Sequence, residues 1–124
     1  MKTDLNQIRE ALVSSFDKHL PPLKVRKSSI ECFEVAGTKK VMQGKKEVDG
    51  FYFASVVPKP KDIRLYFFPI YTHVDAYKEL SAEMRKCLKG KSCFHIKKLS
   101  SEMEREVQEM IAKGVELYLR DGFI

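Results

Sequence analysis

The sequence has no long hydrophobic run. Its longest apolar segments, Phe51–Val57 and Leu65–Tyr71, are far shorter than the roughly 20 residues that a membrane-spanning helix needs. The segment from Met1 to Glu10 contains no continuous apolar stretch of the kind that a signal peptide requires. Low-complexity tracts and internal repeats are also absent, which argues against a solenoid or a disordered chain. We therefore expect a soluble, cytoplasmic protein with no membrane partner.

Cysteine is scarce, and its pattern does not suit a disulfide framework. The chain has three cysteines, Cys32, Cys87 and Cys93, and an odd set without an export signal favours free thiols in a reducing compartment. No Cys-x-x-Cys or His-x-x-x-His spacing marks a zinc site. Cys93 and His95 would share one face of a strand, and Cys32, Cys87 or His73 would have to complete any metal site. We therefore expect no metal and no other cofactor.

Cys93 is the thiol whose neighbours best suit a nucleophile. Lys91, His95 and Lys97 make its surroundings electropositive, and positive charge favours the reactive thiolate. The sequence indicates no carboxylate that would orient a catalytic base. An enzyme that uses Cys93 is therefore kept as an alternative, while we assign no catalytic residue and expect a protein that is not an enzyme.

Basic residues outnumber acidic ones by 23 to 17, which gives a net charge of +6. The excess lies in the first part of the chain, because residues 99–124 hold three bases and six acids. Short lysine clusters with aromatic side chains between them would suit a nucleic-acid surface. Arginine is scarce beside lysine and no recognition motif is present, so nucleic-acid binding is an alternative and not the main expectation.

Apolar spacing predicts three helices and an antiparallel sheet. Residues 5–20 carry apolar side chains at steps of three and four until Pro21 and Pro22 stop the pattern, and Thr3 or Asp4 would cap the start. The other expected elements are strands at 28–36, 38–43, 51–57 and 63–70, a helix at 74–88, a strand at 92–96 and a last helix opened by a capping box of Ser101 and Glu104. This order predicts one α+β domain over residues 1–124, with an antiparallel sheet of about five strands packed with N- and C-terminal helices.

The most informative segment is the hairpin of strands 51–57 and 63–70. Alternate residues of a regular strand point to opposite faces. The expected faces of its first strand are Phe51, Phe53, Ser55 and Val57 on one side, and Tyr52, Ala54 and Val56 on the other. Both faces would then be apolar, whereas an antiparallel sheet with helices on one side usually has a polar outer face. We therefore expect a cover for the second face: a helix or long loop of the same chain, a second copy of the chain, or a small apolar ligand.

Three segments resemble a known family. They are Phe51-Tyr52-Phe53-Ala54, then Leu65-Tyr66-Phe67-Phe68-Pro69-Ile70-Tyr71, then Leu88-Lys89-Gly90-Lys91-Ser92-Cys93-Phe94 ahead of a terminal helix. Their order and spacing are similar to those of the YdhG-like family of small bacterial domains, over roughly residues 5–120. The resemblance implies a frataxin-like fold, in which the turn Lys89-Gly90-Lys91-Ser92 precedes a short strand and the last helix.

A frataxin-like fold also suggests an iron chaperone. Frataxins hold metal through acidic residues near the first helix, and this chain offers Asp4, Glu10 and Asp17 there, dispersed among bases. Hard cations prefer clustered carboxylates. An iron chaperone is therefore kept only as an alternative.

The sequence leads to the hypothesis of a YdhG-like, non-enzymatic binding module that takes a small ligand or a partner protein on an aromatic sheet face. The tyrosines of the site would form an aromatic wall, while its lysine, serine and histidine would anchor a polar or anionic group, since short turns can present backbone N–H groups to anions. A homodimer formed through this face is a further option. The candidate site residues are Tyr52, Tyr66, Tyr71, Lys91, Ser92 and His95.

Overall fold

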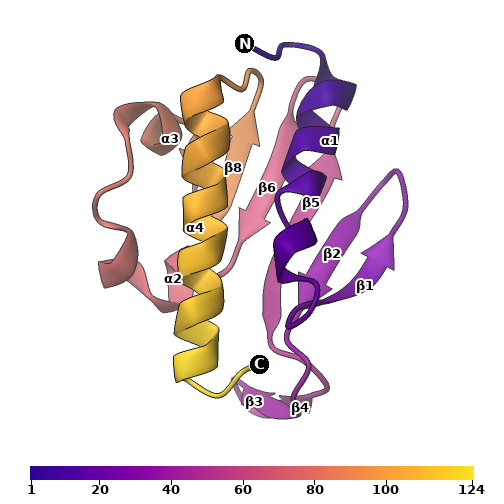
Figure 1. Ribbon diagram of the computed structural model, residues 1–124, viewed down its shortest axis with the longest axis vertical. Coiled ribbons are helices and arrows are strands. Elements are labelled where there is room, and N and C mark those ends of the chain that lie inside the picture. The colour runs from indigo at the N-terminus through magenta and orange to yellow at the C-terminus, as the bar shows by residue number, and fades with distance from the viewer.

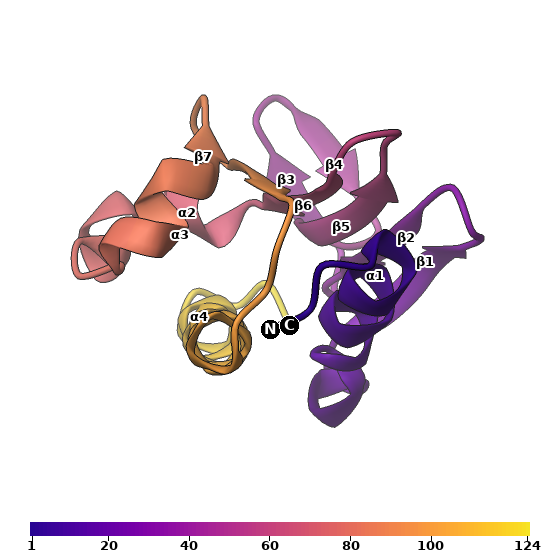
Figure 2. The same cartoon turned by 90° about the horizontal axis from the view of Figure 1, so that it is seen from above.

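Two helices lie side by side on one face of an antiparallel sheet (Figure 1). In the computed structural model, which describes residues 1–124, these are α1 (Leu5–Ser14) and α4 (Ser101–Arg120). Seen from above, both are on the same side of the sheet and no helix lies over the other side (Figure 2). The short helices α2 (Pro69–Thr72) and α3 (Ala82–Cys87) stand beyond one edge of the sheet. The predicted α+β class with N- and C-terminal helices is confirmed.

The main sheet has six strands, one more than the approximate number that we expected. Their order is β1-β2-β5-β6-β8-β7, and every neighbouring pair is antiparallel. The strands are β1 (Lys24–Ser28), β2 (Phe33–Ala36), β5 (Tyr52–Pro58), β6 (Ile63–Phe67), β7 (Leu88–Lys89) and β8 (Cys93–Ile96). A separate two-stranded hairpin of β3 (Val41–Gln43) and β4 (Lys46–Val48) stands at one end of the sheet (Figure 1).

The strand predictions hold best where β-branched and aromatic residues are densest. The predicted hairpin is confirmed as β5 and β6, although Pro69 begins α2, so the second strand ends at Phe67 and not at Ile70. The single strand expected at 28–36 is wrong. Ser29 starts a turn there, because its hydroxyl accepts hydrogen bonds from the backbone N–H groups of Glu31 and Cys32, and such side-chain bonds compete with a strand ladder.

Two helices are shorter than their apolar spacing predicts. Helix α1 begins after Asp4, whose Oδ1 accepts from the Gln7 N–H at 3.1 Å, but it ends at Ser14, where the Ser15 hydroxyl bonds back to the Ala11 carbonyl. A 3₁₀ turn, η1 (Asp17–His19), follows. The helix expected at 74–88 is divided into a 3₁₀ turn, η2 (Val74–Tyr77), and α3.

The break between η2 and α3 is caused by a helix cap. The hydroxyl of Ser81 accepts from the Met84 N–H, and Glu106 on α4 accepts from both the backbone N–H and the hydroxyl of Ser81. In the last helix the N-cap is Ser100, whose hydroxyl accepts from the Met103 N–H. The cap is therefore one residue before Ser101, which the expected capping box used. No helix combines the length and the apolar character that crossing a bilayer requires.

A β-bulge in β5 separates the two faces of the sheet. Val35 pairs with Ala54 but the next residue, Ala36, pairs with Tyr52, so Phe53 is an extra residue on β5. Phe53 and Ala54 are both fully buried on the helix side. Beyond the bulge the alternation is reversed, so that Ser55 returns to the side of Tyr52. The two apolar faces expected from simple alternation are therefore wrong, and the reason is this one inserted residue.

Aromatic side chains from the sheet, from α4 and from the segment just after α1 form the centre of the core. Phe53 packs edge to face on Tyr118 of α4 and Phe67 of β6, with ring centroids 5.1 and 5.6 Å apart. Phe16, just after α1, also meets Phe53 edge to face at 6.3 Å. These rings belong to one cluster of 26 buried hydrophobic residues, so the sheet and both helices share a continuous core. Such aromatic pairs each add about 0.5–1.5 kcal/mol beyond the burial of their area.

Gly114 lets α4 approach the bulge closely. A Cβ atom at this position would lie 3.0 Å from both the Phe53 ring and the Pro69 ring. We expect Gly114→Val to lower the free energy of unfolding by about 1–3 kcal/mol, because the larger side chain would overpack this contact. Ala112→Val, a partly buried position on the same helix, is the control and should cost less than 1 kcal/mol. Urea unfolding of both variants measures the difference, and equal effects would contradict the close approach.

Candidate functional site

The sheet face opposite α1 and α4 has no helix over it (Figure 2). We call it the open face. With one exception its side chains are partly exposed, and the exception is the buried Ser55. The open face comprises Glu34, Tyr52, Ser55, Val57, Arg64, Tyr66, Cys93 and His95.

A row of paired residues crosses the middle of the open face. Glu34 pairs with Ser55, Ser55 with Tyr66, and Tyr66 with Cys93. The Tyr52 hydroxyl donates to Ser55 Oγ at 2.7 Å, which fixes its ring beside the row. Burial raises the pKa of Tyr52 to about 12, so the phenol is protonated and able to donate near neutral pH. Two tyrosines thus flank a serine on the central strands.

A second row of paired residues, with Arg64 at its centre, lies next to the first. Val57, Arg64 and His95 are paired across β5, β6 and β8. The nearly buried carboxylate of Asp62 accepts from Arg64 Nε at 3.2 Å, and its other oxygen lies 3.6 Å from His95 Nδ1. The hydrogen bond to Asp62, with a smaller contribution from the Tyr66 hydroxyl, raises the pKa of Arg64. The bond from Arg64 Nε to Asp62 holds the guanidinium on the open face, beside Tyr66.

The six residues predicted from sequence fall into two places. Tyr52, Tyr66 and His95 lie on the open face. Tyr71 is on α2, and the Lys91 ammonium stands over its ring at 5.4 Å.

One further residue, Phe68, links these places, and the sixth predicted residue, Ser92, lies beside Lys91 in the turn between β7 and β8. Phe68 contacts both Tyr52 and Tyr71, with ring centroids 5.5 and 5.4 Å apart. Ser92 contributes its carbonyl, which accepts from the Phe67 N–H at 2.8 Å, so its backbone is engaged in extending the sheet.

Sequence reasoning missed several members of the open face. Arg64 stands inside an aromatic strand and Asp62 in the loop before it, so neither residue forms part of a recognisable motif. Alternation along β6 does place Arg64 and Tyr66 together, opposite Ile63 and Leu65, and that signal could have found the arginine. The position of Ser55 on this face could not be predicted, because nothing in the sequence indicates the bulge that places it there.

A groove of about 440 Å³ lies between the α2–η2 segment and α3. Two of its five exposed lining residues, Tyr71 and Lys91, belong to the predicted site. We call it the α2–α3 groove. It is lined by apolar Ile70, Tyr71, Val74, Tyr77 and Leu88 and by basic Lys78, Arg85 and Lys91.

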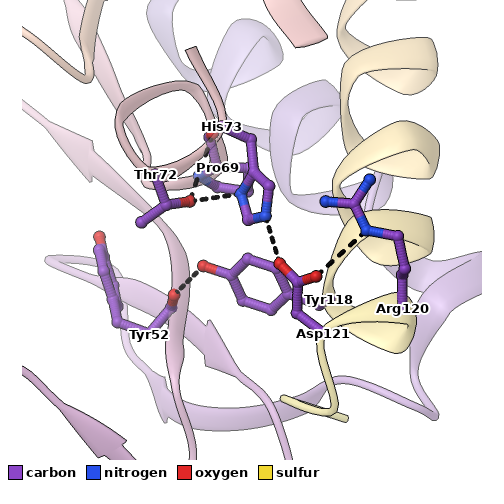
Figure 3. Close-up of polar contacts among 7 residues, drawn as sticks. All are labelled: Tyr52, Pro69, Thr72, His73, Tyr118, Arg120 and Asp121. Carbon is purple, nitrogen blue, oxygen red and sulfur yellow. Dashed lines mark hydrogen bonds and ion pairs between the residues drawn. The ribbon is translucent and has the colours of Figure 1, made fainter. Parts of the chain in front are cut away.

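A third polar cluster joins α2 to the end of α4 (Figure 3). Thr72 Oγ1 lies 2.7 Å from His73 Nδ1, and His73 Nε2 lies 2.5 Å from Asp121 Oδ2. Arg120 donates to the other Asp121 oxygen at 3.1 Å. Thr72, His73 and Asp121 follow the order of a nucleophile, a base and a carboxylate, but the Thr72 hydroxyl also faces the Pro69 carbonyl of its own turn. The geometry indicates a clasp that holds the C-terminal segment.

The same view shows how α4 reaches the bulge (Figure 3). The Tyr118 hydroxyl donates to the backbone carbonyl of Tyr52 at 2.5 Å. Burial raises the pKa of Tyr118, which keeps this donor protonated. Helix α4 therefore contacts the strand that positions Tyr52 on the open face.

The thiols and acidic groups have little of the geometry that catalysis or metal binding would use. Burial raises the pKa of Cys93, although a hydrogen bond with Tyr66 opposes the change, and a reactive thiol needs the opposite shift. No three His, Cys, Asp or Glu side chains gather in a way that could hold a metal ion. No family model, characterised protein or solved structure matches the chain. The open face and the α2–α3 groove are the two candidate binding surfaces of the chain.

The clasp generates a prediction about pH. Hydrogen bonds from His73 and then Arg120 lower the pKa of Asp121 below its ordinary value of 3.8. The ionised carboxylate therefore stabilises the fold above the unfolded pKa, and this contribution is lost as pH falls through the lower folded pKa. We expect Asp121→Asn to lower the free energy of unfolding by about 0.5–1 kcal/mol near neutral pH, and the difference from wild type to shrink below pH 3.8.

Asp75→Asn is the matched control for this test. The Asp75–Lys78 pair is highly exposed, with side-chain exposures of 92% and 70%, so its loss should leave the free energy of unfolding almost unchanged. Denaturant unfolding of both variants across acid and neutral pH makes the comparison. Equal effects of the two variants, or a pH-independent effect at Asp121, would disprove the clasp.

Proposed function

We propose that the protein is a non-enzymatic binding module that recognises a partner protein through its open face. The observation that carries this proposal is a helix-free sheet face with Tyr52 and Tyr66 on neighbouring central strands and Arg64 beside them. Tyrosine and arginine are enriched among residues that dominate binding energy at protein interfaces. Both are already held in place here, so less side-chain entropy is lost when a partner binds.

The shape of the open face favours a protein over a small ligand. Small-molecule sites are concave, and no open-face residue lines any of five cavities of about 200–440 Å³ in the chain. The face also carries both signs of charge, in the Arg26–Glu34 pair at 3.0 Å and the Arg64–Asp62 pair at 3.2 Å. A protein partner with complementary charges would use both pairs to fix its orientation.

The wider setting of the proposal is a YdhG-like domain with a frataxin-like fold that acts in the cytoplasm. The antiparallel α+β architecture is compatible with that resemblance. All three thiols are free, which suits a reducing compartment. Within this proposal the partner is either another protein or a second copy of the chain, and the test below separates the two.

Site-specific photo-crosslinking tests the open face directly. A benzophenone amino acid at Val57, a partly exposed position beside Arg64, should give a specific adduct in a bacterial extract. Excess unlabelled wild-type protein should suppress the adduct by competing for the partner. The unlabelled Tyr66→Ala variant should need about a tenfold or higher concentration to do so, as expected for a residue central to an interface. An adduct of the purified protein with itself would identify the partner as a second copy.

The control places the same crosslinker at Leu119, which is 52% exposed on α4. That position is on the helix side and should give no competed adduct. Adducts that form equally from both positions, or that Tyr66→Ala competes as well as wild type, would contradict the proposal.

Single-stranded nucleic acid is the second candidate, because Tyr52 and Tyr66 stand on adjacent strands of an open antiparallel sheet. Lys89 and Lys27 are paired with Cys93 and Glu34 at the two ends of the central row. Aromatic rings on a sheet can stack bases while cations follow the backbone. The carboxylates of Glu34 and Asp62 on or beside the same face would repel phosphates, so a protein is favoured.

Fluorescence anisotropy of a labelled oligothymidine decides this second candidate. Nucleic-acid binding would appear as an affinity that falls steeply with salt and that drops about tenfold in Tyr66→Ala, since stacking contributes about 1–3 kcal/mol per base. We expect no binding at moderate salt. Tight binding that depends on Tyr66 would replace the protein partner with a nucleic acid.

A further inference from the structure

We infer that the α2–α3 groove binds a small amphiphilic anion, an apolar chain or ring that ends in a carboxylate or phosphate. The groove has a volume of about 440 Å³. This volume is within the range of small-molecule sites, about 300–1,000 Å³. This inference does not depend on the proposed function, because no open-face residue lines the groove.

The groove offers an apolar surface that the chain leaves uncovered. Ile70 and Tyr77 are buried and form part of its wall, but Tyr71 and Val74 are 46% and 62% exposed. An exposed valine beside an exposed tyrosine loses contact with water when an apolar group binds, and about 25 cal/mol is gained for each Å² of apolar area buried. The apolar part of the ligand would therefore lie along these two side chains.

The charges around the groove specify an anionic head group. Lys78, Arg85 and Lys91 line it, and no acidic residue does. Arg85 donates to the backbone carbonyls of Tyr77 and Lys78, which fixes the guanidinium without neutralising it.

The ammonium groups of Lys78 and Lys91 are also placed where they can bind an anionic ligand. Lys91 stands over the Tyr71 ring at 5.4 Å, which brings a cation to the apolar wall. Lys78 faces Asp75 at 3.3 Å, but both side chains are largely exposed, so this pair gives little stability and is easily exchanged for a ligand carboxylate or phosphate.

A neighbouring cavity shows that the charge pattern is local. Tyr77 also lines a second cavity of about 200 Å³, on the side of α4, where three acidic residues outnumber one basic residue: Glu79, Glu106, Glu109 and Lys113. An anion would be repelled from that side and attracted to the groove. The two cavities thus differ in sign on either side of one aromatic ring, which predicts selectivity for charge as well as for apolar character.

The test is a titration of the ¹⁵N-labelled protein with octanoate, octyl phosphate, octylammonium and 1-octanol, followed by NMR chemical shifts. Both anions should shift the amide signals of Tyr71, Val74 and Lys91 and leave those of Ser55 and Tyr66 unchanged. The tighter of the two identifies the preferred head group. Octylammonium and 1-octanol should bind about tenfold or more weakly, because they lack the charge-assisted hydrogen bonds of an anion.

Matched variants separate the site from the general surface. Val74→Glu should abolish octanoate binding, while Val25→Glu, at a valine that is 41% exposed on the far edge strand β1, should leave it unchanged. Lys91→Met should weaken binding about tenfold, while Lys45→Met, on the exposed β3–β4 turn, should not. Equal binding of octanoate and octylammonium, shifts scattered over the surface, or no effect of Val74→Glu would overturn the inference.

Discussion

The structure depends on one extra residue in the central strand. Phe53 is inserted opposite the Val35–Ala36 step, and so Phe53 and Ala54 both point into the core while Tyr52 and Ser55 both lie on the open face. Without the insertion, the Tyr52 and Ser55 hydroxyls would be on opposite sides of the sheet and could not form their 2.7 Å hydrogen bond. The bulge thus gives the core two adjacent apolar residues and gives the other face its polar and aromatic character.

Helix α4 is adapted to this bulge. Gly114 allows the helix to come close to the Phe53 ring, and one turn later the Tyr118 hydroxyl reaches the Tyr52 carbonyl (Figure 3). The clasp between His73 and Asp121 then joins the end of the helix to α2. Packing on the helix side therefore fixes the strand that carries Tyr52, and α2 in turn carries Tyr71 into the α2–α3 groove. Both candidate sites are therefore connected to the contact between α4 and β5.

Much of the fold follows from sequence pattern, and the limits have physical causes. Dense β-branched and aromatic residues marked the β5–β6 hairpin, and apolar spacing marked α1 and α4, because burial on one face imposes a regular period. The predicted bounds are wrong at Ser29 and at Ser81. The side-chain hydrogen bonds of Ser29 form a turn within the expected strand 28–36, and those of Ser81 start a new helix within the expected helix 74–88. Only part of the candidate site could be predicted from the sequence. Tyr66 is on the open face as alternation along β6 predicts, whereas Ser55 depends on the bulge, and the α2–α3 groove forms only when separate segments pack together.

The reversal of alternation at Phe53 is the central claim, and proton–proton distances by NMR test it most directly. The structure predicts nuclear Overhauser contacts from the Tyr52 ring to the Ser55 methylene, and from the Phe53 ring to Tyr118. It predicts none between Ser55 and Tyr118. A regular strand would turn Ser55 toward α4 and Ala54 away from it. Contacts between Ser55 and Tyr118, with none between Ser55 and Tyr52, would contradict the bulge and remove the open face that it creates.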